Sequence, residues 1–119
     1  MFDLVHKSEN HGTRNFQAVG RLTHSTMSSH ESFDEFLKDN LDQSVIVDLE
    51  RLEIIDSTGI GWLLKKNREF SDNGGRLVLH SLQPNVAKVF GMMKLGAVLT
   101  VVDSENAAND LIANSGVEQ

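Results

Sequence analysis

The stretch "VIVDLERLEIIDSTGIGWLL", residues 45–64, carries most of the information about the fold. With the preceding serine it opens with "SVIVDL", residues 44–49, a β-branched run typical of a central strand that is covered on both faces. It closes with isoleucine and leucine at the spacing of a buried helix stripe. Three helix-capping residues lie in a row between these two patterns, the first of them Asp56. The stretch therefore predicts a strand followed by a helix that begins after Asp56.

The junction itself has more small and polar residues than capping requires. One capping side chain at Asp56, Ser57 or Thr58 stabilises a helix start by roughly 1 kcal/mol. Gly59 and Gly61 are not explained by capping, since each glycine costs about 1 kcal/mol inside a helix relative to alanine. We interpret them as clearance for a molecule that approaches the helix start. A phosphate on Ser57 would be tolerated there and would add about −1.5 to −2 charges beside Asp56.

The pattern of apolar residues predicts the remaining elements on both sides of this stretch. Residues 2–7 and 15–22 read as an antiparallel hairpin. After the polar loop "THSTMSSHES", Ser28 and Glu31 form a capping box for a helix with Phe33, Phe36 and Leu37 inward. Strands are expected at 76–80 and 98–102, and a helix is expected after each of them.

The starts of those two helices are predicted by a proline and by a capping residue. Pro84 suits the first turn of a helix with Val86, Val89, Phe90 and Met93 inward. Asp103 or Ser104 caps a last helix with Ala107, Ala108, Leu111 and Ile112 inward. The order predicts an α/β fold: a mixed sheet of about five strands, an N-terminal antiparallel hairpin followed by parallel βα units, with about four helices. We expect one domain, 1–119, with a frayed tail from about residue 114.

Composition excludes several classes of function. The chain has 119 residues, 17 acidic against 11 basic, and a formal charge of −6. That balance argues against binding nucleic acid, although it suits a protein partner with a basic surface. There is no cysteine, which excludes disulfides and thiolate sites. The N-terminus lacks the apolar core of a signal peptide and no run can span a bilayer, so we expect a cytoplasmic protein without membrane insertion.

Other chemical sites fit the sequence poorly. Gly59 and Gly61 could open a dinucleotide-binding turn, but the third glycine of that motif is replaced by Leu64. A receiver domain phosphorylated on Asp48 or Asp56 would need an acidic pair and a lysine that are not visible. No G-x-S-x-G motif supports a hydrolytic serine. The five histidines lack metal-ligand spacing, and no cofactor is expected.

Trp62 lies about 200° around the helix from Ile60, so we expect it to point away from the buried stripe. Lys65, Lys66 and Glu69 are placed on the same outer face. Two interpretations stay open at this point. Trp62 either lies under a neighbouring loop or anchors a contact with a protein partner, where exposed aromatic residues are enriched.

The residues quoted above resemble the signature of the STAS domain, in particular that of the bacterial anti-sigma-factor antagonists. In that family a hydrophobic strand runs into D-S-[ST]-G-[LI]-G at a helix start. The likeness continues through "GGRLVLHSLQPNVAKVF", residues 74–90, which is similar to the family's G-G strand followed by P-x-V-x-x-x-F. It covers the whole chain in element order and is strongest from Val45 to Phe90.

The resemblance implies a binding protein that serves as a switch and kinase substrate and is not an enzyme. Its partner would be an anti-sigma factor that is a serine kinase of the histidine-kinase-like ATPase superfamily. That kinase would phosphorylate Ser57, with Thr58 as the fallback acceptor, and thereby break the complex, and a PPM-type phosphatase would reverse the step. The implied partner-binding residues are Thr23, His24, Asp56, Ser57, Thr58, Gly59, Gly61, Trp62 and Lys65.

The chain departs from the family pattern in two places. Many antagonists have G-E-L-D at the end of the second strand, where the acid contributes to kinase recognition, and here the stretch ends in Thr23. The turn after the third helix commonly has Gly-Leu, and here it has Lys94 and Leu95. The first departure bears on which partner is bound. An alternative role is a STAS scaffold or accessory subunit, of a stress-signalling complex or a membrane transporter, without regulated phosphorylation.

Overall fold

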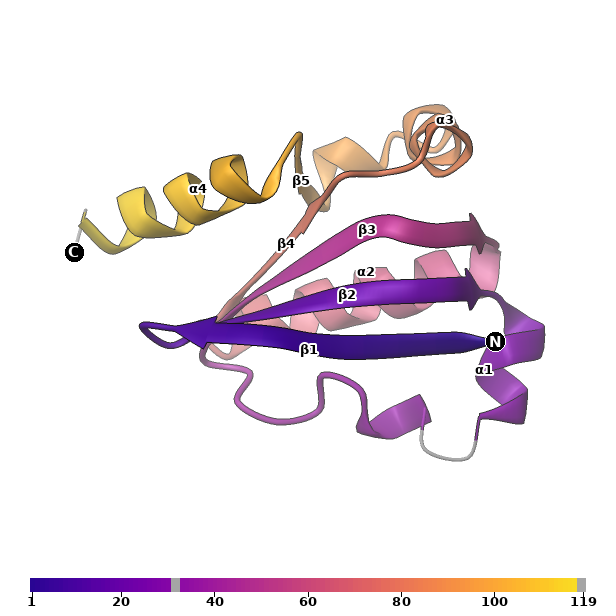
Figure 1. Cartoon of the computed structure of the whole chain (residues 1–119), viewed down its shortest axis with the longest axis horizontal. Coiled ribbons are helices and arrows are strands. Elements are labelled where there is room, and N and C mark those ends of the chain that lie inside the picture. Colours follow the sequence, from indigo (N-terminus) through magenta and orange to yellow (C-terminus); the bar gives the residue numbers. More distant parts are fainter. Residues whose placement is uncertain (31–32, 118–119) are drawn as a thin grey trace.

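The computed structural model describes residues 1–30 and 33–117 and contains one five-stranded sheet in the order β1-β2-β3-β4-β5 (Figure 1). The strands are β1 (Phe2–Asn10), β2 (Thr13–Leu22), β3 (Ser44–Ile55), β4 (Arg76–His80) and β5 (Thr100–Val102). β1 and β2 pair antiparallel, and every other neighbouring pair is parallel. The predicted mixed α/β sheet with an N-terminal hairpin is confirmed.

Four α-helices accompany the sheet in the described residues, as predicted. They are α1 (His24–Ser29), α2 (Ser57–Asp72), α3 (Pro84–Met92) and α4 (Glu105–Val117). Two short 3-10 turns, η1 (Phe33–Glu35) and η2 (Leu95–Ala97), complete the elements. Within the described residues, no helix is both long and apolar enough to cross a membrane.

The sheet separates two apolar clusters of different size, because successive side chains of a strand point to opposite faces. The larger one combines strand residues with residues of η1, α2, α3 and η2; its members include Val45, Val47, Leu77, Leu79, Ile60, Leu63, Phe70, Val86 and Phe90. On the other face, Ile46 and Val78 pack with Ala108 of α4. The helices α2 and α3 therefore pack on the face of the larger cluster, and α4 packs on the opposite face.

The predicted starts of α2 and α3 are confirmed. Asp56 is the N-cap of α2, and the helix ends where Gly74 adopts a positive φ of 85° and the N–H of Gly75 donates to the carbonyl of Phe70 at 2.8 Å. Pro84 occupies the first turn of α3. Glycine adopts a positive φ after a helix at little cost, and proline suits the first turn of a helix because the N–H that it lacks has no partner within the helix there.

The secondary structure expected for residues 23–37 is wrong, although Phe33, Phe36 and Leu37 do pack into the core as predicted. The stretch read as a polar loop forms α1, whose N-cap is Thr23. The Thr23 side chain accepts from the backbone N–H of Thr26, and the Thr26 hydroxyl oxygen accepts from that of Thr23, which is a reciprocal capping box. The helix expected after Ser28 is reduced to the turn η1, and Glu31 of its supposed capping box lies outside the described residues.

Smaller differences concern strand and helix ends. β3 continues well past residue 49, to Ile55, and β5 begins at Thr100 instead of residue 98. Met93 was expected inward, but it lies just after the last turn of α3 and is 54% exposed. The helix α4 continues to Val117.

Candidate functional site

Ser57 and Thr58 are the first two residues of α2, and both are exposed at the end of the sheet where β3 stops. In the part of the chain that the structure describes, no hydrogen bond engages the Ser57 hydroxyl. A side chain at this position lies beside the positive end of the helix dipole, which favours negative charge. Ser57 is therefore presented to solvent where a covalently attached phosphate is compatible with the fold.

The Asp56 carboxylate joins the starts of two helices. Its Oδ1 accepts from the backbone N–H of Gly59 at 3.0 Å, which caps α2. Its Oδ2 accepts from the backbone N–H of His24 at 2.9 Å, which holds the first residue of α1. These hydrogen bonds, that from His24 first, lower the pKa of the Asp56 carboxyl below its ordinary value, since they favour the charged form. Asp56 thereby fixes α1 next to Ser57.

The two glycines of the junction have different roles. Gly59 is buried, and a Cβ there would collide with the backbone carbonyl of Leu22 and approach Ile55 Cγ1 to 3.0 Å. Our interpretation of Gly59 as clearance for a partner is therefore wrong, because the close approach is made by the end of β2. Gly61 is exposed, and nothing lies within 4 Å of where its Cβ would be. Gly61 alone agrees with that interpretation.

Four exposed positions lie on neighbouring parts of this end of the molecule. Ser57, Gly61 and Lys65 are spaced four residues apart, so they follow one stripe along α2. His24 is tied to the same helix start through Asp56. We call His24, Ser57, Gly61 and Lys65 the Ser57 face. Thr23 lies at its border as a half-buried cap, so the structure brings most of the predicted partner-binding residues together.

The expectation that Trp62 points outward is wrong. Trp62 is 9% exposed, and its ring lies 5.1 Å from that of Phe33 in an edge-on arrangement. The segment around η1 covers this flank of α2, so the helix is buried on more than its predicted stripe. Lys66, also expected outside, is 7% exposed and donates to the carbonyl of Leu37 at 3.3 Å. The interpretation of Trp62 as a residue under a neighbouring segment is the one the structure supports.

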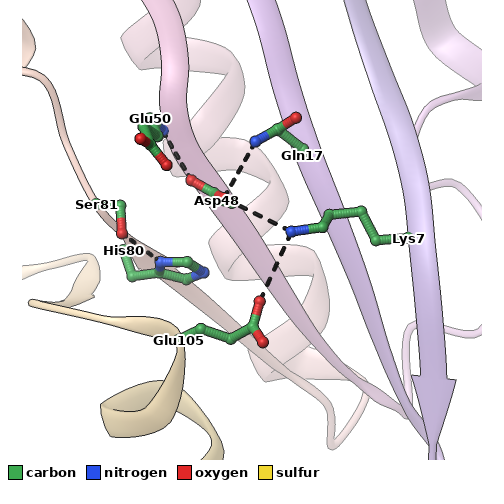
Figure 2. Close-up of polar contacts among 7 residues, drawn as sticks. All are labelled: Lys7, Gln17, Asp48, Glu50, His80, Ser81 and Glu105. Carbon is green, nitrogen blue, oxygen red and sulfur yellow. Dashed lines mark hydrogen bonds and ion pairs between the residues drawn. The ribbon is translucent and has the colours of Figure 1, made fainter.

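A second polar cluster lies on the opposite face of the sheet (Figure 2). Asp48 of β3 is paired in register with His80 of β4, and both are buried. The Asp48 carboxylate accepts from the backbone N–H of Glu50 at 2.8 Å and from Gln17 Nε2 at 3.2 Å. Lys7 Nζ lies 3.8 Å from a carboxylate oxygen of Asp48 and of Glu105, the first residue of α4. The cluster ties β1, β3 and α4 together.

Sequence analysis did not identify this cluster, although a signal existed. Asp48 and His80 each stand three residues after the start of an apolar run, at Val45 and Leu77. Two parallel strands that begin level with each other place such residues side by side. The Nδ1 atom of His80 is 2.8 Å from the Ser81 hydroxyl, and Nε2 has no hydrogen-bond partner in the described residues.

Replacing Asp56 tests its double role. We expect Asp56→Ala to lower the free energy of unfolding by about 1–2 kcal/mol, because the capping acceptor of α2 is lost. The His24 amide should also exchange its hydrogen faster with solvent, since its acceptor disappears. Because the carboxyl pKa is lower in the folded state, this stabilisation is complete above the ordinary pKa of about 4 and is lost as pH falls through the folded value.

Ser104→Ala is the matched control for that measurement. Ser104 caps α4 by accepting from the N–H of Ala107 at 3.1 Å, so its loss also removes one cap. It should leave the exchange rate of the His24 amide unchanged. Equal protection of the His24 amide in Asp56→Ala and in the unmodified chain would contradict the bridging role.

His80 should make stability depend on pH in a different range. Burial lowers the pKa of the His80 imidazole, although the carboxylates of Asp48 and Glu105 oppose this. A lowered folded pKa means that the stabilisation is complete above about pH 6.5 and is lost as pH falls through the folded value. In chemical unfolding between pH 7.5 and 5, the stability advantage over His80→Gln should therefore shrink. His11→Asn, at the exposed hairpin turn, is the control; parallel curves for His80→Gln and the unmodified chain would refute the prediction.

Comparison with known proteins agrees with this architecture. The sequence model of the STAS domain family matches residues 6–108 of this chain. The matched region contains the strand β3, the capped, serine-bearing start of α2 and the mixed sheet described above. The chain belongs to the STAS domain family.

Particular relatives are anti-sigma factor antagonists. The anti-sigma F factor antagonist of Paenibacillus polymyxa is 26% identical over 94 residues, which cover 77% of this chain and 80% of that protein. The anti-sigma factor antagonist SpoIIAA in its unphosphorylated form is 26% identical, with a TM-score of 0.69 and coverage of 96% of this chain and 97% of that one. The Bacillus cell fate determinant SpoIIAA in the phosphorylated form is 27% identical, with a TM-score of 0.57 and coverage of 94% and 99%.

Proposed function

We propose that this protein is an anti-sigma-factor antagonist that binds a serine-kinase anti-sigma factor through the Ser57 face and is released by phosphorylation of Ser57. The observation that carries the proposal is the exposed Ser57 side chain at a capped helix start, beside the open surface of Gly61. The names of the relatives support the first part, and the existence of SpoIIAA in phosphorylated and unphosphorylated forms supports the second.

Electrostatics gives the proposed switch its physical basis. Phosphorylation adds about −1.5 to −2 charges at pH 7 within the contact surface. The Asp56 carboxylate lies next to it and is held in the charged form by its hydrogen bonds to His24 and Gly59. Repulsion and the cost of burying these charges then weaken a closely packed complex, while the helix dipole keeps the fold intact. Thr58 is the fallback acceptor, and a PPM-type phosphatase restores the binding form.

Thr23 occupies the position at which many family members have an acidic residue. Threonine and aspartate are both good N-caps, so Thr23 keeps α1 in place without a charge. A kinase that binds this chain would then lack the acidic contact that Asp offers in other members. We propose that the partner's surface opposite Thr23 is uncharged, which makes it a different kinase from those that recognise the acid.

The test is a calorimetric titration of the protein with a serine-kinase anti-sigma factor captured with it from the native cell extract. We expect a saturable complex with the unphosphorylated chain, because the Ser57 face is open, and at least tenfold weaker binding after phosphorylation. No complex in either state would remove the anti-sigma role. Thr23→Asp is a useful companion variant, since it restores the family's acid at a cap position and should keep the fold.

A second candidate function is a scaffold or accessory subunit without regulated phosphorylation. It is favoured by the Asp56 contacts, because capping and the attachment of α1 use this carboxylate whether or not Ser57 is modified. The two functions are distinguished by pull-down from the native cell extract with and without phosphatase treatment. Capture of a transporter ATPase, equal in both samples, supports the scaffold role and contradicts the switch.

A further inference from the structure

The surface formed by α3 and η2 differs in composition from the rest of this acidic chain. From residue 81 to residue 102 the sequence contains no aspartate or glutamate and has two lysines, Lys88 and Lys94. The whole chain carries a formal charge of −6. Both lysines are exposed, so this segment presents positive charge on an otherwise negative protein.

A hollow of about 340 Å³ opens in this surface. Its lining comes from α3, η2, β5 and the segment between β4 and α3, and consists of Leu82, Ala87, Phe90, Gly91, Lys94, Gly96, Ala97 and Val101. Lys94 is the charged member of that lining. Four of the lining residues are glycine or alanine, so the floor leaves room for a large side chain supplied from outside.

Exposed apolar side chains adjoin the hollow along the chain. Met92, Met93 and Val98 are 74%, 54% and 59% exposed. Adjacent exposed methionines are characteristic of adaptable surfaces that receive amphipathic helices, since the side chain is flexible and polarisable. The apolar area therefore extends beyond what a single small molecule in the hollow would cover.

We propose that this surface binds an acidic amphipathic helix of a protein partner, with one large apolar side chain in the hollow and carboxylates near Lys88 and Lys94. The apolar lining supplies burial, and the two lysines select the charge of the partner. The site uses neither Ser57 nor any other residue of the Ser57 face, so it is independent of the proposed function.

Two synthetic peptides test the proposal by NMR titration of the ¹⁵N-labelled chain. Both carry the same leucine and phenylalanine stripe at helical spacing, one with glutamate and the other with lysine on the flanks. We expect the glutamate peptide to shift the amide signals of Ala87, Gly91, Gly96 and Ala97 saturably. It should bind at least tenfold more tightly than the lysine peptide.

Two variants separate the hollow from the charge. Gly91→Leu should abolish binding while leaving the fold intact, because nothing lies within 4 Å of a Cβ at Gly91 and leucine favours helix. Lys94→Glu should reduce binding of the glutamate peptide at least tenfold and strengthen that of the lysine peptide. Arg68→Glu, an exposed charge reversal on α2, is the matched control and should change neither affinity.

Several results would overturn the proposal. One is equal affinity for the two peptides, and another is absence of shifts at millimolar peptide. Amide shifts confined to the Ser57 face would show that the peptide binds there and not in the hollow. Concentration-dependent self-association of the free chain that Gly91→Leu abolishes would identify a second copy as the occupant instead. The peptide titrations do not depend on whether a kinase phosphorylates Ser57. The proposal for this surface and the proposed phosphorylation switch can therefore be refuted independently of each other.

Discussion

Ser57→Asp should weaken binding of the serine kinase at least tenfold, equivalent to about 1.4 kcal/mol or more of binding free energy. The substitution places a permanent charge beside Asp56 within the proposed contact surface. Ser57→Ala removes the acceptor hydroxyl without adding charge, so its affinity should stay within about threefold of the unmodified chain. Calorimetric titration of both variants with the kinase provides the comparison.

The fold should survive the added charge, because aspartate in the first turn of a helix interacts favourably with the helix dipole. A melting temperature within a few degrees of the unmodified chain checks this. Ser104→Asp is the matched control: it introduces the same charge at the start of α4, on the other face of the sheet, and should not affect binding. Equal affinities for Ser57→Asp and Ser57→Ala would contradict the charge argument.

The second large effect is expected from Gly59→Ala, which should destabilise the protein by about 3 kcal/mol. The new methyl group meets the backbone carbonyl of Leu22, which cannot move without disturbing the end of β2. For a chain of this size, the loss corresponds to a melting temperature lower by about 10 °C. Thermal unfolding followed by circular dichroism measures it.

Gly61→Ala is the matched comparison, two residues further along the same helix. A Cβ there meets nothing within 4 Å, and alanine favours the helix, so stability should rise by up to about 1 kcal/mol. The same substitution should reduce affinity for the kinase, since Gly61 lies on the Ser57 face. Destabilisation by Gly61→Ala similar to that of Gly59→Ala would show that both glycines serve packing.

Much of the architecture was predictable because local signals agreed with it. The β-branched run at β3, the Asp56 cap and the proline at the start of α3 are all short-range features. Each acts through the backbone conformation or hydrogen bonding of a few neighbouring residues. The exposure of Ser57 followed from the same reasoning.

What could not be predicted depends on contacts between distant segments. Trp62 is covered by Phe33, which is 29 positions earlier in the sequence, and helical periodicity contains no information about such a cover. The group that a Cβ at Gly59 would meet is the backbone carbonyl of Leu22 in β2. The second Asp56 hydrogen bond, to His24, likewise requires knowing that α1 begins beside α2. The sequence predicts a candidate site at the start of α2, and tertiary packing decides which of its residues are exposed.

The most direct test of the account is incubation of the protein with its cognate kinase and ATP, followed by peptide mass spectrometry. We predict a single phosphate on the peptide that contains Ser57, located on Ser57 itself and absent in Ser57→Ala, apart from minor modification of Thr58. The exposed hydroxyl at the capped start of α2 is the reason for that assignment. If the protein binds the kinase but carries no phosphate on Ser57 or Thr58 after the incubation, the proposed switch is contradicted.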